Sequence, residues 1–124
     1  MTAVVAGVLI RDERILICQR RADQPHALKW EFPGGKLEAG ESPGEALRRE
    51  LNEELGIEAT PGRELMRYEF SYPGKNPILL IFFEVTVWAG EIENRIFEKV
   101  LWENREALSG YDFLEGDTRF IACL

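Results

Sequence analysis

The sequence predicts a single α/β domain in which a mixed β-sheet is flanked by one long helix and a shorter helix near the carboxyl end. The 124 residues match the size of one domain, and 45% of them are hydrophobic, which is enough for one core. Segments rich in β-branched and aromatic residues lie on both sides of a helical segment that has a regular apolar stripe. We therefore expect one domain over residues 1–124.

Strands are predicted where β-branched and aromatic residues gather between turn residues. They lie at about Ala3–Ile10, Arg14–Arg20, Glu64–Tyr72, Pro77–Trp88 and Lys99–Glu103. Tight turns at Arg11–Glu13 and Pro73–Asn76 are expected to join the first two strands and the next two. After the last strand, we expect one helical turn at Glu106–Ser109 and a closing helix at Gly116–Leu124.

The long helix is predicted over Pro43–Leu55. Ser42 and Glu45 have the spacing of a capping box, and proline is favoured at the first helical position. Gly56 is placed to end the helix, because glycine adopts the left-handed conformation there without penalty. The stripe that would pack on the core consists of Ala46, Leu47, Leu51 and Leu55.

Three glutamates, Glu50, Glu53 and Glu54, lie on one face of this helix at positions i, i+3 and i+4. Like charges at this spacing destabilise a helix by roughly 0.2 to 0.5 kcal/mol per pair. Arg49 can offset part of the repulsion, since Glu45 and Glu53 are each four residues away. A divalent cation such as Mg²⁺ would resolve the rest. Because the glutamates flank the apolar stripe, we expect them at the partly desolvated edge of the interface.

The segment Pro33-Gly34-Gly35 precedes the helix and is predicted to be a turn rather than a regular element. Glycines there allow the backbone to approach a ligand closely, so a main-chain carbonyl could complete the coordination of a metal ion.

These residues resemble the Nudix box. Its pattern is G, five residues, E, seven residues, REU, one residue, EE, one residue, GU, where U is a bulky aliphatic residue. The fixed positions are filled by Gly35, Glu41, Arg49, Glu50, Leu51, Glu53, Glu54, Gly56 and Ile57. The run Trp30–Lys36 is also similar to that of MutT-type nucleoside triphosphate pyrophosphatases. The resemblance implies a Nudix-type α/β/α sandwich with a mixed sheet, one long catalytic helix and a C-terminal helix.

The resemblance also implies roles for the helix residues. Glu50, Glu53 and Glu54 would bind the catalytic cations, Mg²⁺ or Mn²⁺, with the Gly34 carbonyl as a further ligand. Arg49 would orient the carboxylates, because its planar fork makes paired hydrogen bonds. Glu41 is expected to be either a structural anchor of the loop or a ligand. The general base would be Glu53 or an acid from another loop.

A further metal-binding glutamate is present in some MutT-like proteins, six residues before a tryptophan. If Trp102 is that tryptophan, the equivalent position is Ile96, which departs from the pattern. Glu98 or Glu93 could substitute from a shifted loop, and we favour Glu98. The alternative is that Glu98 is a solvated loop carboxylate.

Arg20 lies where the subfamily commonly has an arginine in its second strand, so we predict phosphate binding, with an ion pair or a plain surface charge as alternatives. Arg21, Lys29 and Lys36 are weaker candidates for contact with substrate. Phe32 would contribute its amide and ring to the base pocket, unless it is simply part of the core.

Asp117 falls where MutT has an asparagine that reads an oxidised guanine. An ionised aspartate only accepts hydrogen bonds, so it would prefer the donors of guanine or the amino group of cytosine. If the carboxyl is buried, a raised pKa would let it donate as well. Asp117 could instead be a helix N-cap.

Composition limits the partners. A net charge of −7 and a pI near 4.8 argue against binding a nucleic acid polymer. The longest apolar run, Ile78–Phe83, is too short to span a membrane, and the amino terminus lacks the features of a signal peptide. Cys18 and Cys123 lack metal-site spacing and are not expected to form a disulfide. We expect a cytoplasmic monomer or homodimer without a membrane partner.

The sequence therefore predicts a MutT-like Nudix hydrolase that cleaves a (deoxy)nucleoside triphosphate to the monophosphate and pyrophosphate. Its substrate could be 8-oxo-dGTP, in nucleotide-pool sanitation and thus DNA repair. One alternative is a pyrophosphatase for CTP, dCTP or methylated dCTP. Another, of a different class, is a non-catalytic nucleotide sensor, although a sensor has no need of three intact glutamates.

Overall fold

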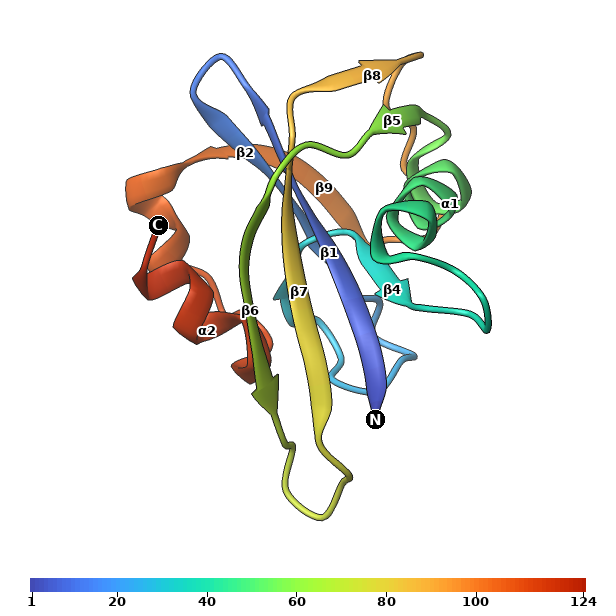
Figure 1. Cartoon of the computed structure of the whole chain (residues 1–124). Coiled ribbons are helices and arrows are strands. Elements are labelled where there is room, and N and C mark those ends of the chain that lie inside the picture. Colours follow the sequence, from blue (N-terminus) through green and yellow to red (C-terminus); the bar gives the residue numbers. More distant parts are fainter.

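A long central strand, β1 (Thr2–Arg11), organises the sheet of this computed structural model, which describes residues 1–124 (Figure 1). β1 runs parallel to β7 (Ile78–Val85) and antiparallel to β4 (Gly34–Lys36). The remaining strands extend the sheet on both sides and add a small second sheet. β6 (Glu64–Phe70) pairs with β7, β2 (Arg14–Gln19) pairs with β1, β3 (Trp30–Glu31) and β9 (Lys99–Asn104), and β5 (Glu58–Thr60) pairs with β8 (Val87–Ala89).

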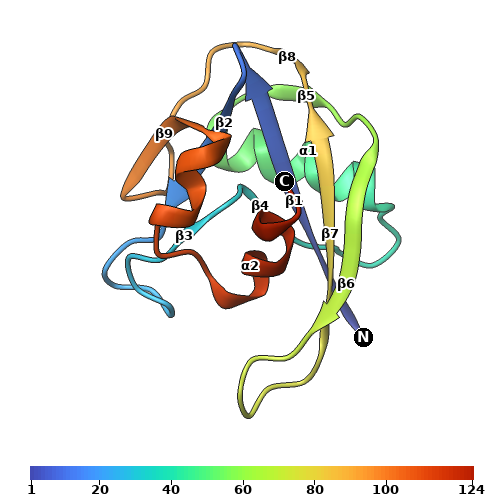
Figure 2. The ribbon, with the colours of Figure 1, turned by 90° about the vertical axis from the view of Figure 1, so that its left-hand side faces the viewer.

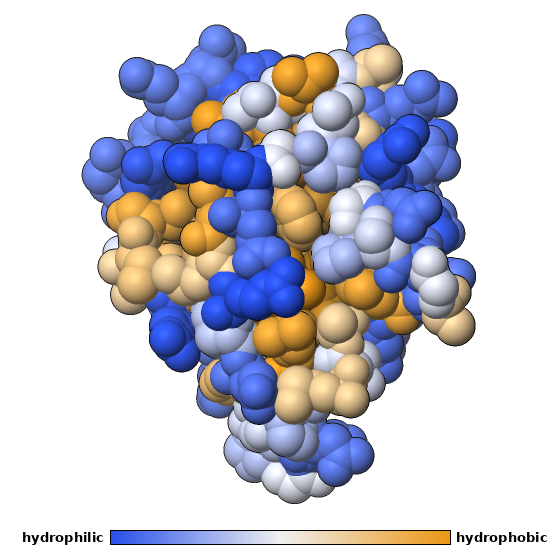
Figure 3. Space-filling model, in the orientation of Figure 1, coloured by the Kyte–Doolittle hydropathy of each residue, from blue (hydrophilic) through white to orange (hydrophobic).

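Two helices cover opposite faces of this sheet (Figures 1 and 2). α1 (Pro43–Leu55) closes one hydrophobic cluster, and α2 (Glu115–Ala122) closes the other together with a 3₁₀ helix over Arg105–Gly110. Hydrophilic side chains dominate the surface of the face seen in Figure 1, and hydrophobic residues show between them along its centre (Figure 3). No helix is both long and apolar enough to cross a membrane. The predicted sandwich of helices around a mixed sheet is confirmed.

The ends of α1 are those that the sequence predicts. The Ser42 hydroxyl accepts a hydrogen bond from the Glu45 amide at 3.2 Å, and the Glu45 carboxylate accepts one from the Ser42 amide at 2.8 Å. Gly56 has a φ of 70°, the left-handed conformation that ends a helix. The predicted apolar stripe is fully buried, so packing on the sheet fixes which face of α1 points outward.

The prediction of a turn at Pro33-Gly34-Gly35 is wrong, because Gly34 and Gly35 belong to β4 and pair with Ala6 and Val5 of β1. Gly34 has a φ of 153°, and a Cβ atom there would lie 2.0 Å from the Val5 carbonyl oxygen. The close approach that glycine permits is therefore to a neighbouring strand.

The single strand predicted over Pro77–Trp88 is also wrong, since the chain leaves the main sheet after Val85. The continuation, β8, pairs with β5, which follows α1, and its Val87 and Trp88 extend the β-branched and aromatic run of β7. No strand was expected at β3 or β5, which have only two and three residues. The other predicted strands, both turns and the closing helix agree to within a few residues.

Candidate functional site

Glu54 is the buried member of the three carboxylates on α1, with 8% of its surface exposed. Its Oε1 accepts a hydrogen bond from the Gly34 amide of β4 at 3.1 Å. Burial raises the pKa of Glu54 to about 9, and the hydrogen bond and charge of Glu50 reinforce the shift. Glu54 therefore holds a proton at neutral pH unless a cation takes its place.

Glu50 lies between α1 and β4, and its side chain is 15% exposed. Its Oε1 accepts a hydrogen bond from Arg49 at 2.9 Å. A Cβ atom on Gly35 would come within 2.6 Å of the Glu50 carboxyl carbon, so the strand passes very close to this carboxylate. Glu53 is 57% exposed and contacts only Arg49, at 3.5 Å. The expectation of partial desolvation is thus wrong for Glu53, which points outward from the helix.

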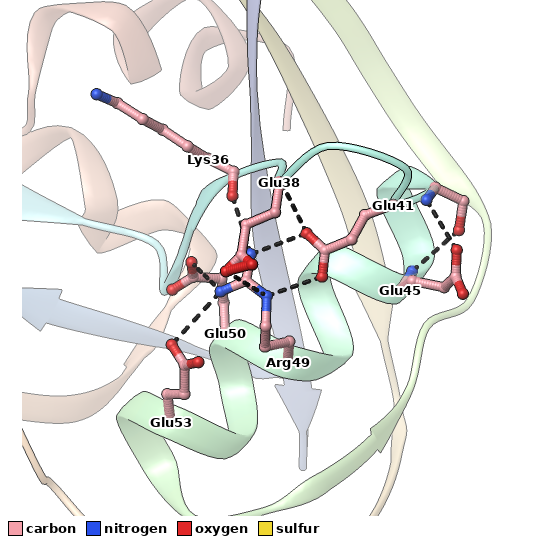
Figure 4. A network of polar contacts seen from close by, with 8 residues as sticks. Lys36, Glu38, Glu41, Glu45, Arg49, Glu50 and Glu53 are labelled. Carbon is pink, nitrogen blue, oxygen red and sulfur yellow. Dashed lines mark hydrogen bonds and ion pairs between the residues drawn. The ribbon is translucent and has the colours of Figure 1, made fainter.

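Arg49 connects the carboxylates of α1 to the preceding loop (Figure 4). Its guanidinium donates to both carboxylate oxygens of Glu41, at 2.8 and 2.9 Å, and to the Lys36 carbonyl at 3.0 Å. The bonds from Arg49 and a further one from the Glu38 amide hold the pKa of Glu41 at about 2, and they tie this residue to the loop as a structural anchor. The predicted contact between Arg49 and Glu45 is wrong, because the Glu45 carboxylate caps the helix instead.

The three carboxylates are not drawn together into a closed metal cluster, and no group of three or more His, Cys, Asp or Glu side chains in the structure is arranged to hold a metal ion. Arg49 holds Glu50, and Glu53 extends into solvent. The residues nevertheless fit a hard divalent cation. Glu54 is a buried carboxyl with no cationic side chain against it and with a second carboxyl, Glu50, as its neighbour. Glu53 is the third carboxylate of this helix face, and it is exposed to solvent.

The predicted carbonyl ligand, Gly34, lies beside Glu54, but the contact seen is through its amide. Lys36 joins the site only through its carbonyl oxygen, and its side chain points away from the carboxylates (Figure 4). The roles of Gly34 as a metal ligand and of Lys36 as a substrate contact remain predictions.

Arg20 lies at the end of β2 and forms an ion pair with Glu31 of β3, with Nη1 3.2 Å from the carboxylate. Its Nε donates to the Pro25 carbonyl at 2.9 Å. Burial raises the pKa of Glu31, and the charge of Arg20 opposes the shift. The charge of Glu31 also helps to raise the pKa values of Glu54 on α1 and of Asp117 on α2. Its carboxylate therefore influences both groups. Glu31 was not among the residues predicted for the site, although an acid between two aromatic residues, Trp30 and Phe32, marks it in the sequence.

Asp117 is buried in the first turn of α2, and the prediction of an N-cap role is wrong because Leu114 occupies the N-cap position. Burial raises the pKa of Asp117 to about 8, the charge of Glu31 adds to the shift, and the nearby backbone amide of Phe32 opposes it. The Phe32 ring packs against Phe82, Phe113 and Phe120. The predicted pair, Phe32 and Asp117, is therefore brought together, with the ring of Phe32 in the core.

The loop before β9 docks on the carboxyl end of α1. The Arg95 amide donates to the Glu54 carbonyl at 3.1 Å, and its guanidinium donates to the Asn52 carbonyl at 3.1 Å. Glu98 is exposed and donates its amide to the Gln19 carbonyl, and no hydrogen bond or ion pair joins its side chain to the α1 glutamates. The catalytic role predicted for Glu98 remains a prediction. Arg95 was missed, although α1 lacks a basic residue in its last turn.

Comparison with known proteins gives a consistent result. The family model described as NUDIX domain matches residues 1–121. An 8-oxo-dGTP diphosphatase of Haemophilus influenzae is 40% identical over 119 residues, which cover 94% of this chain and 87% of the relative. A CTP pyrophosphohydrolase of Escherichia coli is 38% identical over 117 residues, 94% of this chain and 86% of the relative. A solved structure of MutT, from work on Aliivibrio salmonicida and Vibrio cholerae, superposes with a TM-score of 0.82 at 31% identity, covering 98% of this chain and 94% of the other.

Proposed function

Since the chain belongs to the NUDIX domain family, we propose that it hydrolyses nucleoside triphosphates to the monophosphate and pyrophosphate, with 8-oxo-dGTP as its substrate. Enzymes of this family depend on divalent cations, and we propose Mg²⁺, with Mn²⁺ as a substitute. The donors at the site are oxygen atoms, which Mg²⁺ prefers. The nucleotide pool of the cytoplasm is the setting that this substrate implies.

The side chains of the site have different proposed roles in hydrolysis. Glu50 and Glu54 would hold the cation at the inner end of the site, and Glu53 would lie at its solvent side. A bound cation would stabilise charge on the phosphoryl oxygens and lower the pKa of an attacking water. Arg49 holds Glu50 in place and ties it to the loop through Glu41. Glu53 is the carboxylate least engaged with other groups, so it is free to accept the proton of that water.

The choice of 8-oxoguanine as the nucleobase rests on one observation, the buried Asp117 beside the Phe32 amide. With a pKa of about 8, this carboxyl is protonated at neutral pH. It then both donates and accepts, as an asparagine does. That pattern favours 8-oxoguanine, which the resemblance assigns to an asparagine at this position. Arg20 is paired with Glu31, which directly precedes Phe32 in the chain. We propose that Arg20 contacts the phosphates of the nucleotide.

A CTP or dCTP pyrophosphatase is the second candidate, because a relative with 38% identity is a CTP pyrophosphohydrolase. Here an ionised Asp117 would accept from the amino group of cytosine. The two candidates predict opposite effects of pH. Protonation of Asp117 should favour the oxidised purine, so its advantage in kcat/KM should shrink as the pH rises through about 8.

The deciding experiment measures kcat/KM with Mg²⁺ for 8-oxo-dGTP, dGTP, CTP, dCTP and 5-methyl-dCTP, by release of pyrophosphate. We expect 8-oxo-dGTP to exceed the others by at least about tenfold. A preference for CTP or dCTP would establish the second candidate, and equal, poor rates on all of them would contradict both. Binding of nucleotides without turnover would indicate a sensor.

Two variants connect the activity to the site. Glu53→Gln removes the proposed base while keeping the size of the side chain, so turnover should be lost with the fold intact. Glu58→Gln is the matched control, because Glu58 is also exposed near the end of α1 but makes no polar contact through its side chain. Normal activity in Glu53→Gln would move the search for a base to other loops, beginning with Glu98.

A further inference from the structure

The first turn of α2 lacks the usual side-chain cap, because Leu114 occupies the N-cap position. Amide groups in the first turn of a helix have no partner within the helix. Here the Gly116 amide donates to the hydroxyl oxygen of Tyr72 at 3.1 Å. Tyr72 follows β6, so a residue distant in the sequence does what an N-cap side chain would do.

A second tyrosine holds the other side of Gly116. The Tyr68 hydroxyl donates to the Gly116 carbonyl at 2.5 Å, and this bond is buried. Burial raises the pKa of Tyr68 to about 12, so the hydroxyl keeps its proton at every working pH. The ring is held as well, since Phe82 stacks at 5.7 Å and the Arg119 guanidinium lies 4.7 Å from the ring centroid.

These two hydroxyls fix the peptide groups on both sides of Gly116, which directly precedes Asp117. Space around Gly116 is tight, because a Cβ atom there would lie 3.0 Å from the Tyr72 hydroxyl oxygen and 3.1 Å from Leu80. A shift of this turn would move the Asp117 carboxyl relative to Phe32.

We propose that Tyr68 and Tyr72 are positioning residues that hold Asp117 opposite the Phe32 amide and thereby set the base selectivity of the enzyme. This inference rests on the proposed function, in which Asp117 reads the base. It assigns selectivity to two hydroxyl groups that do not touch the base themselves.

Phenylalanine variants isolate the hydroxyl groups. Tyr72 also contacts the rings of His26 and Phe70, at centroid distances of 4.9 and 4.8 Å, and phenylalanine would keep these contacts. In Tyr72→Phe, and more strongly in Tyr68→Phe/Tyr72→Phe, we expect KM for the preferred triphosphate to rise by about three- to tenfold with kcat within about twofold of the parent, as for the loss of ordinary hydrogen bonds. KM for poor substrates should change less, so selectivity falls.

Tyr111→Phe is the matched control. The Tyr111 hydroxyl also donates a 2.5 Å bond, but to Glu103 of β9 rather than to α2. Its selectivity should equal that of the parent. Gly116→Ala offers an independent perturbation, because the new methyl group presses on the Tyr72 hydroxyl. It should lower selectivity in the parent and should do so less in Tyr72→Phe, where the hydroxyl is gone.

The outcomes separate this inference from the function on which it rests. If Asp117→Ala lowers selectivity while both tyrosine variants leave it unchanged, the positioning role is overturned and the base reading stands. An equal rise of KM for every triphosphate in the tyrosine variants would also overturn it, because that result indicates a general loss of structure. If Asp117→Ala leaves selectivity unchanged, Asp117 does not read the base, so the base reading and the positioning role both fall while hydrolysis of triphosphates stands.

Discussion

Replacing Asp117 by asparagine should change how the stability of the protein depends on pH. Asparagine has nearly the same shape but no titrating proton. In the folded protein the pKa of Asp117 is about 8, because the carboxyl is buried and lies near Glu31. In the unfolded chain an aspartate titrates near about 3.9. Between these values the folded protein keeps a proton that the unfolded chain has lost.

The sign and size follow from this difference in bound protons. The contribution of Asp117 to stability is complete below pH of about 3.9 and is lost as the pH rises through about 8. Across that window the free energy of unfolding falls by about 1.4 kcal/mol per pH unit. From pH 5 to pH 7, Asp117→Asn should therefore gain up to about 2.7 kcal/mol of stability relative to the parent. Above pH of about 8 the difference should level off, because the carboxyl is ionised in both states.

Urea denaturation of both proteins at several pH values between 5 and 9, with a chelator present, measures this difference directly. The contributions of the other titrating groups cancel in the difference between the two free energies of unfolding, because both proteins contain these groups. Asp112→Asn is the control, since Asp112 is an exposed aspartate paired with Lys29. Stability curves of the parent and Asp117→Asn that run parallel between pH 5 and pH 7 would refute the reasoning, because they would mean that Asp117 titrates as an ordinary surface acid.

Three further predictions concern α1 and its carboxylates. Ser42→Ala removes the side-chain acceptor of the capping box, so the free energy of unfolding, measured in urea, should fall by about 1 kcal/mol. Gly35→Ala would place a methyl group 2.6 Å from the Glu50 carboxyl carbon; kcat/KM should drop by at least about tenfold with an unchanged circular dichroism spectrum. Mg²⁺ at a hundred times its Kd should stabilise the parent by about 2.7 kcal/mol, and Glu54→Gln should lose most of that gain in thermal denaturation.

The local parts of the fold were predictable from the sequence because local chemistry determines them. The capping box, Gly56 and the leucine stripe fix where α1 begins, ends and packs, and all were identified correctly. The errors arose where partners distant in the sequence decide the structure. Nothing in Pro77–Trp88 marks the point at which the strand leaves one sheet for another, and nothing near Gly34 indicates that β1 lies alongside.

The candidate site divides in the same way. Glu50, Glu53 and Glu54 were found from helical spacing alone, since side chains three and four residues apart share a face. Their different environments could not be found in this way, because the burial of Glu54 and the exposure of Glu53 depend on where β4 crosses the helix. Resemblance pointed to Asp117, but its raised pKa required knowing that the carboxyl is buried and that Glu31 lies close by.

A single segment, residues 31–36, connects the proposed site of base recognition on α2 with the proposed metal site on α1. Its Phe32 amide lies close to the Asp117 carboxyl of α2, and its Gly34 amide donates a hydrogen bond to Glu54 on α1, on the opposite face of the sheet. In an extended chain two residues span about 7 Å, so the length of this segment sets the distance between the proposed base reader and the proposed metal ligands. A change in Phe32–Gly34 that alters the backbone should therefore affect selectivity and turnover together, whereas changes confined to α2 should affect selectivity alone.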